Sequence, residues 1–439
     1  MGLKPGYKQT AVGLIPEDWG VAPLNALISS LDAGVSVNSV AKEEDTIAHD
    51  VSILKTSCVL GGRFFPEEHK SIVPRDVHRA KLTPRKGRIV ISRMNTPALV
   101  GECAYVEHDY PTLFLPDRLW MTRHEGREPF CATWLAYLLN VGAFRRAIRD
   151  CATGTSGSMK NISKGSFLSI QIPLPLKAEQ QAIAEALSDA DALIESLGQL
   201  IAKKSHLKQG TVQELLTGRK RLPGFTTHTD GHQETDVGLI PEDWEVVNLV
   251  DCLRERPAYG INAPAVQYQD SLPTYIRITD ITDDGRFSPE HLVSVKADKA
   301  ADYFLQDGDL VFARTGASVG KSYRYLPTDG RLVFAGFLIR VHPDPDCLNP
   351  LFLAAFVTTA RYWNWVRLMS MRSGQPGING NEYAQLPIPR PPIAEQAAIA
   401  AVLSDMDAEI STLEAKLAKT RQIKQGMMHN LLTGRIRLV

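Results

Sequence analysis

The sequence predicts an α+β protein with two globular α/β regions, each followed by one long helix, and an internal repeat that relates its two halves. First, the proline-free stretch at 179–219 recurs at 395–435, and more than half of the paired positions are identical. Second, the octapeptide VGLIPEDW occurs at 12–19 and again at 237–244, before each globular region. Third, the globular regions share a few landmarks in the same order. This pattern indicates a tandem duplication whose globular parts have diverged.

Each repeated stretch reads as one continuous helix with a coiled-coil seam. Apolar residues alternate steps of three and four, which is the spacing of an a/d seam. We expect the two seams to pack on each other, and at about 1.5 Å per residue each helix would be roughly 60 Å long. The seam residues are Ile183, Leu187, Ala190, Ile194, Leu197 and Ile201 in the first helix, and Ile399, Leu403, Met406, Ile410, Leu413 and Leu417 in the second.

Both seams are interrupted at the same place. Lys204 and Thr420 occupy the position where the next apolar residue belongs. Apolar residues resume one register over, at Leu207 and Ile423, which predicts a stutter-like shift. This is either a place where the pair opens to receive a partner or, more simply, the end of close packing.

The VGLIPEDW repeat predicts a structural anchor. A proline followed by two acids and a tryptophan is typical of a turn or short helix start that fixes an aromatic side chain. We therefore interpret it as a docking element and not as a ligand site.

The two globular regions follow one plan. Strand-like runs at 88–91 and 103–106 precede a helix-like stretch at 130–149 and a polar, glycine-rich loop at 152–163. In the second region, 307–326 parallels 86–106 and places Arg314 opposite Arg93, while 350–371 parallels the helix. Each loop then leads through a strand into a long helix. Outside these landmarks the two sequences share little, and 222–236 has the composition of an exposed linker.

Composition excludes several classes of protein. The 439 residues carry a formal net charge of +0, so a nucleic-acid-binding surface would have to be local. Six scattered cysteines without a CxxC pair argue against a zinc ribbon and a secreted disulfide framework. The sequence shows neither a signal peptide nor an apolar run of membrane-spanning length. These features predict a cytoplasmic protein.

Motif searches give no catalytic constellation. The sequence GASVGKS at 316–322 has three residues between its glycines where a P-loop needs four, so it predicts a tight turn between strands. NPLF at 349–352 carries leucine where the NPPF loop of amino-methyltransferases has proline, and it suits a helix N-terminus. Asp117 and Asp344 lack a well-spaced Glu-x-Lys partner, and the histidines form no metal-binding pattern. We expect no catalytic residues and no metal site.

Local charge is more informative. The stretch 74–93 is rich in lysine and arginine and contains one acid, Asp76, while Arg145, Arg146, Arg149, Lys160 and Lys164 flank the first glycine-rich loop. In the second region, arginines alternate with aromatic residues over 361–372. Such runs are often only solvated surface. Two similar domains, however, suit a two-part DNA target, on which phosphate contacts position the protein and base-edge contacts specify the sequence.

These motifs together resemble the specificity subunit of a type I restriction-modification system. The resemblance rests on GLIPEDW before each globular region, the PLP or PRPP turn into an AEQ helix start, and the LLTGR helix end, and it covers nearly the whole chain twice. It implies two target recognition domains, each reading half of a split, asymmetric DNA sequence, separated by two long antiparallel helices that form a coiled coil. The implied segments are a first target recognition domain at 1–176, a spacer helix at 177–220, a linker and second domain at 221–392, and a spacer helix at 393–439.

The resemblance also implies partners. Two methyltransferase subunits would dock on the helices, restriction subunits would join through them, and double-stranded DNA would bind the domains. S-adenosylmethionine, ATP and Mg²⁺ would belong to the partner subunits and not to this chain. The alternatives are an enzyme in its own right, such as a P-loop ATPase or a fused methyltransferase, and a two-headed coiled-coil protein adaptor without specific DNA binding.

Base-reading residues do not carry over by motif, so we nominate them from charge and loop composition. Two half-sites about one helical turn apart would place basic loops of both domains in the DNA grooves. The candidates are Arg93, Thr155, Ser156, Lys160 and Asn161 in the first domain, and Arg314, Thr315, Arg372, Ser373, Gln375 and Asn379 in the second.

Overall fold

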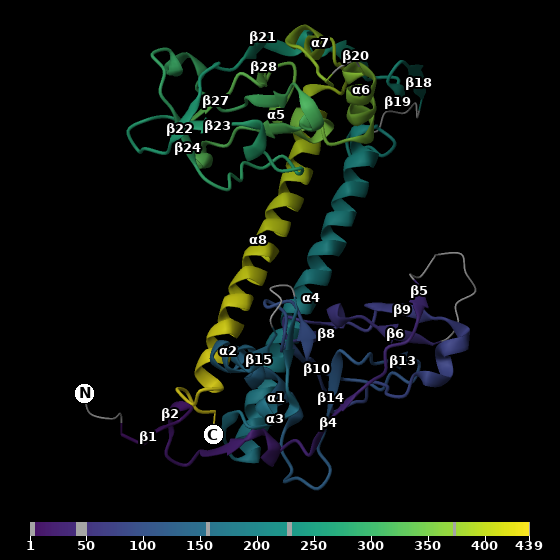
Figure 1. The fold of residues 1–439 in the computed structure, drawn as a ribbon. Helices are drawn as coiled ribbons and strands as arrows, with labels where there is room; N and C mark the ends of the chain where they lie inside the picture. The colour runs from purple at the N-terminus through teal and green to yellow at the C-terminus, as the bar shows by residue number, and fades with distance from the viewer. Residues whose placement is uncertain (1–4, 41–50, 155–158, 226–230, 372–374, 439) are drawn as a thin grey trace. The chain divides into compact units, whose positions relative to one another are not determined.

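A computed structural model describes residues 5–40, 51–154, 159–225, 231–371 and 375–438. The chain divides into two compact units: unit 1 comprises 1–197 and 416–439, and unit 2 comprises 198–415. The division passes through both long helices, so each unit holds one globular region and one end of each helix (Figure 1). The segment boundaries drawn from the sequence stay a prediction.

Unit 1 is built mainly from short antiparallel strands. One four-stranded sheet has the order β12-β10-β14-β4 and another the order β13-β6-β9-β5, in which β13 and β6 are parallel. The smaller sheets are β1-β2, β17-β3, β7-β8 and β11-β16-β15. The strands are β1 (Tyr7–Thr10), β2 (Gly13–Pro16), β3 (Gly20–Pro23), β4 (Ser30–Ala33), β5 (Ser39–Val40), β6 (Ser52–Leu54), β7 (Val59–Leu60), β8 (Arg63–Phe64), β9 (His69–Ile72), β10 (Ile89–Ser92), β11 (Met94–Asn95), β12 (Cys103–Tyr105), β13 (Leu113–Phe114), β14 (Leu119–Arg123), β15 (Ala152–Thr153), β16 (Lys160–Ile162) and β17 (Gln171–Leu174).

Unit 2 repeats this arrangement. Its four-stranded sheets have the orders β21-β28-β25-β26 and β22-β24-β23-β27, and β23 and β27 are parallel. Two antiparallel pairs, the hairpin β18-β19 and the long-range pair β20-β29, complete the unit. The strands are β18 (His232–Thr235), β19 (Gly238–Pro241), β20 (Glu245–Asn248), β21 (Leu253–Tyr259), β22 (Ala265–Gln267), β23 (Thr274–Ile276), β24 (Val293–Val295), β25 (Leu310–Ala313), β26 (Ser322–Arg324), β27 (Leu332–Phe334), β28 (Leu338–Pro343) and β29 (Pro387–Arg390).

The two units therefore share more than their sequences indicate. Both four-stranded sheets of unit 1 have a counterpart in unit 2 with the same strand order and the same parallel pair. The matching strands β10 and β25 are buried along their whole length, and many different apolar sequences satisfy such positions. This is why the topology repeats where the sequences have diverged.

Each helix-like stretch of the globular regions is broken into two short helices. The predicted helix at 130–149 is α1 (Ala132–Leu139) followed by α2 (Gly142–Asp150), so the expectation of one helix is wrong. The matching stretch gives α5 (Pro350–Phe356) and α6 (Ala360–Ser370). Thr359 caps α6 by accepting from the amide of Tyr362, which explains the break there. The remaining short helices are α3 (Lys164–Leu168) and α7 (Gly380–Ala384).

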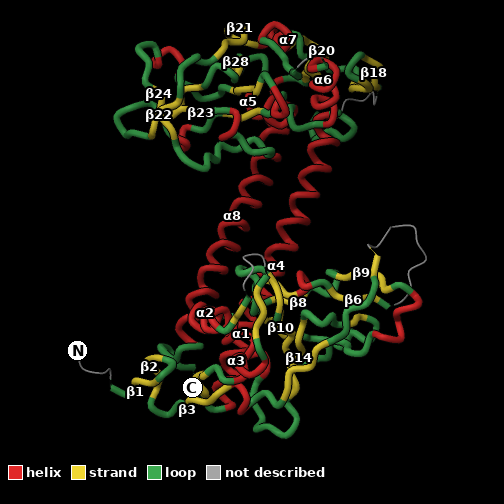
Figure 2. The backbone as a smooth tube through the Cα atoms, in the orientation of Figure 1, coloured by secondary structure: helices red, strands yellow, loops and turns green. Residues whose placement is uncertain are grey.

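The two repeated stretches form the long helices as expected. Helix α4 (Lys177–Leu216) spans 40 residues and α8 (Ile393–Leu431) spans 39, each without interruption (Figure 2). Within unit 2, Lys204 contacts Glu409 and Lys208 contacts Asp407. A later residue of α4 thus pairs with an earlier residue of α8, so the two helices run in opposite directions. Within unit 1, Lys424 contacts Asp191 at 2.6 Å. The helices are antiparallel in each unit and form the coiled coil.

The packing side of both helices follows the apolar seam. Within the seam, one group is buried and the rest are half-buried. The buried members are Ile183, Leu187, Leu197, Ile399, Leu403 and Ile410, and the half-buried ones are Ala190, Ile194, Ile201, Met406, Leu413 and Leu417.

The predicted register shift after Lys204 and Thr420 is wrong. Leu207 and Ile423 are 52% and 51% exposed, so they do not continue the seam. The face instead continues in register through Lys208 and Lys424, whose ammonium groups meet Asp407 and Asp191. A lysine stem covers apolar surface while its charge reaches a carboxylate, so the seam remains closed without an apolar residue.

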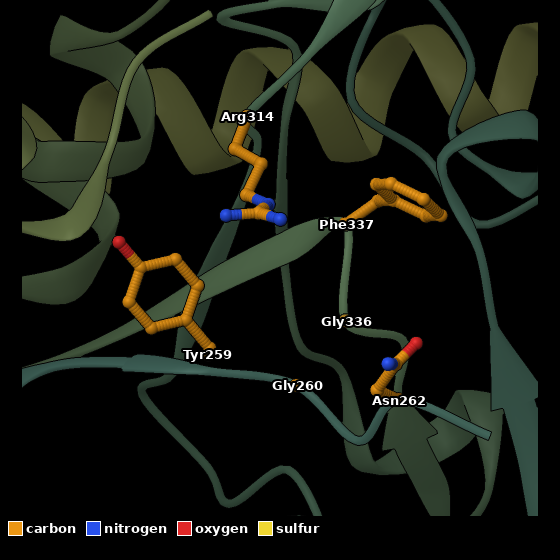
Figure 3. A pocket seen from close by; sticks show the side chains of 6 residues that line it. All are labelled: Tyr259, Gly260, Asn262, Arg314, Gly336 and Phe337. Atoms are coloured by element: carbon orange, nitrogen blue, oxygen red, sulfur yellow. The ribbon is translucent and has the colours of Figure 1, made fainter.

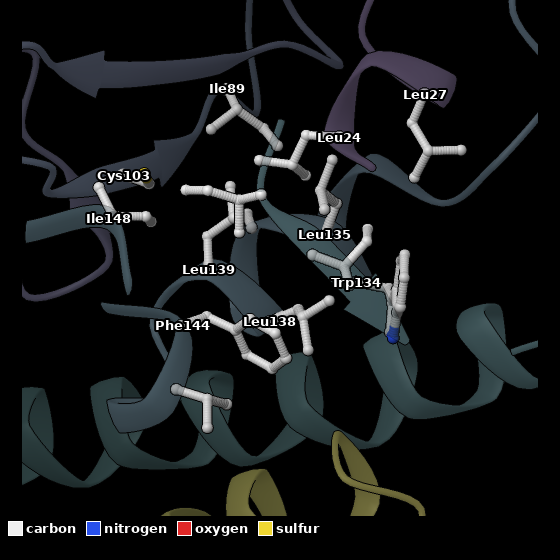
Figure 4. Close-up of a cluster of buried hydrophobic side chains, with 14 of the residues drawn as sticks. Leu24, Leu27, Ile89, Cys103, Trp134, Leu135, Leu138, Leu139, Phe144 and Ile148 are labelled. Carbon is white, nitrogen blue, oxygen red and sulfur yellow. The ribbon is translucent and has the colours of Figure 1, made fainter. Parts of the chain in front are cut away.

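Each long helix begins on the core of its own globular region. In unit 1 the core joins α1 and α2 to strand β10 and to the first turns of α4 (Figure 4). Leu431 and Leu432, at the end of α8, belong to the same cluster. Trp19 and Trp244 of the two PEDW sequences are 0% and 1% exposed. They are aromatic anchors as predicted, and of the two predicted conformations, turn or helix start, the structure has the turn, which follows strands β2 and β19.

Candidate nucleic-acid interface

The two nominated arginines occupy equivalent positions in the two units. Arg93 follows β10 and Arg314 follows β25, which are matching strands of the four-stranded sheets. The Arg93 amide donates to the carbonyl of Arg118, and the Arg314 amide donates to that of Phe337, both at 3.1 Å. The carbonyl of Arg93 accepts from the amide of Ile162, at the end of β16, and that of Arg314 accepts from the amide of Ile378, just before α7. The backbone therefore presents both side chains in the same way.

Both guanidinium groups are held by aromatic rings and not by acids. The Cζ of Arg93 lies 5.8 Å from the centre of the Trp120 ring, and that of Arg314 lies 5.1 Å from the Tyr259 ring. Among the described residues neither group has a hydrogen bond or an ion pair, and both Nε atoms are buried without a partner. Arg340, on the neighbouring strand β28, instead pairs with Glu255. Leaving a buried donor unpaired costs free energy, so these two are suited to an acceptor from outside the chain.

The other candidates of unit 1 lie beside Arg93. Asn161 pairs with Met94 through the β11–β16 ladder, and its Oδ1 is buried without a partner among the described residues. Lys160 precedes it, and its ammonium donates to the carbonyl of Gly154 at 2.9 Å. The structure therefore brings Arg93, Lys160 and Asn161 together. Thr155 and Ser156 lie outside the described residues.

In unit 2 some of the described candidates lie near Arg314, whereas Asn379 caps a helix. Thr315 lies next to Arg314 and forms a bridge with Gly377, and Gln375 is exposed on the same loop. Asn379 has a structural task, because its side chain accepts from the amide of Glu382 in a capping box at the start of α7. Arg372 and Ser373 lie outside the described residues.

Sequence reasoning missed the residues that surround Arg314. Tyr259, Asn262 and Phe337 line a pocket with it, together with Gly260 and Gly336 (Figure 3). They come from the end of β21 and from the turn before β28, and no motif or spacing predicts that these segments meet. The matching positions of unit 1 include Ser36 and Asp117, which are hydrogen-bonded to each other.

The basic stretch at 74–93 is partly neutralised. Arg79 pairs with Asp76 and Arg88 with Glu125, and four other basic residues of the stretch are exposed. The exposed residues are Arg75, Lys81, Arg85 and Lys86.

The arginine and aromatic residues of α6 do not form one surface. Tyr362 is buried in the core, where its hydroxyl donates to the carbonyl of Gly320 at 2.7 Å. Burial, and then the neighbouring Arg219, lowers the pKa of Arg361. Trp363 is the exposed aromatic of the group. This helix therefore contributes mainly to packing.

The rejected chemical motifs have structural roles. Gly316–Ser318 forms a short turn between β25 and β26, as predicted for GASVGKS. Asn349 caps α5 by accepting from the amides of Leu351 and Phe352, as predicted for NPLF. In the part of the chain that the structure describes, no cluster of histidine, cysteine and acidic residues could hold a metal ion. None of the described helices is long and apolar enough to cross a membrane.

The division into two similar units agrees with the comparison with known proteins. The model of the type I restriction modification DNA specificity domain matches this chain twice, over residues 51–203 and 241–424. The chain belongs to this family. It is thus the DNA-recognition subunit of a type I restriction-modification system, a non-catalytic component.

Two relatives of this family align with the chain over nearly the whole length of both proteins. A protein of Methanocaldococcus jannaschii, provisionally named the type I restriction enzyme MjaX specificity subunit, is 24% identical and aligns over 98% of this chain and 97% of its own. The type I restriction enzyme StySPI specificity subunit of Salmonella potsdam is 22% identical over 97% of this chain and 90% of its own. The crystal structure of the type I restriction-modification S subunit from M. genitalium shares the fold, with a TM-score of 0.58 at 14% identity and 98% of each chain covered.

Proposed function

We propose that each unit of this specificity subunit reads one half of a bipartite, asymmetric DNA sequence. The observation that carries the proposal is the half-buried arginine at the same place in both sheets, which has no hydrogen-bond or ion-pair partner among the described residues of its unit. Arginine is the side chain that most often reads guanine and also contacts phosphate. The residues proposed to contact DNA are Arg93, Thr155, Ser156, Lys160 and Asn161 for one half-site, and Arg314, Thr315, Arg372, Ser373, Gln375 and Asn379 for the other.

The long helices are proposed to set the gap between the half-sites and to dock two methyltransferase subunits. Leu207 on α4 and Ile423 on α8 support two equivalent docking places, because they are paired in the repeat and are exposed to the same extent. A large apolar side chain that is exposed at the same repeat position of both helices suits a protein partner. Restriction subunits would then join through the methyltransferases.

Cofactors are proposed to bind the partner subunits. S-adenosylmethionine would be held by the methyltransferases, and ATP and Mg²⁺ by the restriction subunits. The complete complex would act in the cytoplasm, where the chromosome is its substrate.

The experiment is to map methylated adenines genome-wide in cells that express the chain with its methyltransferase. We expect a split motif with a fixed gap. Arg93→Ala should relax one half of the motif and Arg314→Ala the other, because each arginine belongs to one unit. Arg123→Ala is the matched control, since Arg123 is exposed and pairs with Asp32. A complex that methylates without a split motif, or that binds no DNA, would contradict the proposal and favour a protein adaptor.

The gap-setting role has its own test. Four residues inserted into α4 would lengthen it by about 6 Å. The mapped gap should then widen while both half-site sequences stay the same. A change in the half-site bases would show that the helices do not set the gap.

A further inference from the structure

A pocket of about 350 Å³ surrounds Arg314 in unit 2. Its guanidinium lies between the rings of Tyr259 and Phe337, at 5.1 and 5.9 Å from their centres (Figure 3). The Asn262 amide lines the same pocket. Tyr259 and Phe337 are 43% and 57% exposed, so the two rings flank an opening on the surface. Two half-exposed aromatic side chains around an unpaired cation are costly to display unless a ligand covers them.

The frame of the pocket is fixed by its backbone. A Cβ atom on Gly260 would lie 2.2 Å from the carbonyl oxygen of Ala335, and one on Gly336 would lie 3.3 Å from that of Ile261. The two segments can approach closely because both residues are glycines. The Tyr259 hydroxyl accepts a hydrogen bond from the Gly380 amide at 2.9 Å, which fixes the ring. The walls beside the guanidinium are therefore formed before a ligand binds.

The position of Arg314 favours recognition of a planar edge with two acceptors. A phosphate can also be bound by a mobile surface lysine, which acts as a point charge. A guanidinium whose plane is held between rings presents parallel N–H groups in a set direction, which is the geometry that guanine O6 and N7 accept. Asn262 is a second donor and acceptor on the same wall.

The equivalent place in unit 1 is lined differently. Arg93 keeps the backbone position of Arg314, but Ala33 lies at the strand position of Tyr259 and Arg118 at that of Phe337. Ser36 and Asp117 are hydrogen-bonded to each other there. The two units thus hold the same side chain in different chemical surroundings, as expected if they read different bases.

We propose that the Arg314 pocket is the guanine-reading site of the half-sequence recognised by unit 2. Arg314 donates to O6 and N7 of one guanine in the major groove. Tyr259 and Phe337 hold the plane of its guanidinium, and Asn262 contacts the adjacent nucleotide. The inference rests on the proposed function, in which unit 2 reads one half-site.

The experiment uses the complex of the full chain with its methyltransferase subunits and a duplex that carries the mapped motif. Each guanine of the two half-sites is replaced in turn by 7-deazaguanine, which lacks the N7 acceptor. At one guanine of one half-site, we expect the wild-type complex to lose roughly five-fold or more in affinity, as for a broken bidentate contact. Arg314→Ala should bind both duplexes equally, because the contact is already gone. Arg314→Lys should regain only part of the affinity and of the discrimination, because an ammonium can donate to O6 and N7 but lacks the planar fork of the guanidinium.

Arg331→Ala is the matched control, because Arg331 also lies over an aromatic ring, that of Phe304, but outside the pocket. It should keep the full 7-deazaguanine penalty. A phosphate contact would overturn the inference: Arg314→Ala would then weaken binding to every duplex alike and reduce the salt slope by about one. An unchanged penalty in Arg314→Ala would overturn it as well. If the wild-type complex showed no sequence preference at either half-site, the proposed function itself would fail, which is a distinct result.

Discussion

Arg437, which follows the last long helix, donates from Nη2 to the carboxylate of Glu179 at 2.8 Å, although Glu179 begins the first long helix. The indole N–H of Trp19 donates to the same carboxylate at 2.8 Å, and Nη1 of Arg437 donates to Asp18. Unit 2 contains the same cluster, formed by Arg221, Glu395, Trp244 and Asp243. In each unit the end of one repeat is therefore joined to the beginning of the other. The two copies of the repeat are structurally interdependent.

Arg437→Ala should strongly destabilise unit 1. Glu179 has a side chain that is 1% exposed, so the substitution leaves a buried carboxylate without its cation. Breaking a buried pair in this way costs about 3–5 kcal/mol. Urea denaturation followed by tryptophan fluorescence would measure the loss, because Trp19 belongs to the cluster. Arg437→Met combined with Glu179→Gln should recover most of it. A loss below about 1 kcal/mol for Arg437→Ala would mean that the cluster is not a stabilising contact.

Replacing Gly210, inside α4, and Gly218, just after its C-terminus, by alanine should change the free energy of unfolding in opposite directions. Gly218 has a φ of +70°, and a Cβ there would lie 2.4 Å from the Pro241 ring, so Gly218→Ala combines backbone strain with a clash. We expect it to cost at least about 1–2 kcal/mol. Gly210 lies inside the helix with no atom within 4 Å of a Cβ, and Gly210→Ala should stabilise by about 0.8–1 kcal/mol. Thermal unfolding of both variants checks the pair. Equal changes in unfolding temperature for the two variants would contradict the placement of the end of α4 before Gly218.

Substitutions on the exposed side of the long helices should change the number of bound methyltransferases. Leu207→Glu and Ile423→Glu each place a charge at one of two equivalent exposed positions. Each variant should bind one methyltransferase in place of two, and the double variant none, as measured by native mass spectrometry. Lys419→Glu, also exposed on α8, is the control and should leave the stoichiometry at two. Two bound subunits in the double variant would show that docking uses another surface. The unfolding temperatures should remain close to that of the wild type, since these side chains face solvent.

The helices, the anchoring tryptophans and the equivalence of Arg93 and Arg314 were predictable because each depends on residues close together in the sequence. The pocket was not, because Asn262, Arg314 and Phe337 come from three separate segments that meet only in the folded sheet. The error over Leu207 has a similar cause. A heptad pattern counts apolar residues, whereas the seam accepts Lys208, whose charge is neutralised by Asp407 on the other helix. Nothing local to Lys208 predicts that partner.

His124 should make the stability of unit 1 depend on pH between neutrality and pH 4. Burial, and then the nearby Arg88, lowers the pKa of His124 to about 4, and its ring packs edge-on against Phe130. The folded state therefore holds the neutral imidazole at a pH where the unfolded chain, with an ordinary pKa of about 6.5, already binds a proton. The contribution of the neutral His124 to the free energy of unfolding is complete above about pH 6.5 and is lost as the pH falls toward 4. After allowance for the partial exposure of the ring, the loss between pH 7 and pH 5 is about 1 kcal/mol. His124→Phe keeps the aromatic contact and should reduce the fall in unfolding temperature over that range, whereas substituting the exposed His108 by Gln should not. An identical pH profile for His124→Phe and the wild type would mean that the imidazole is protonated in the folded protein at pH 5.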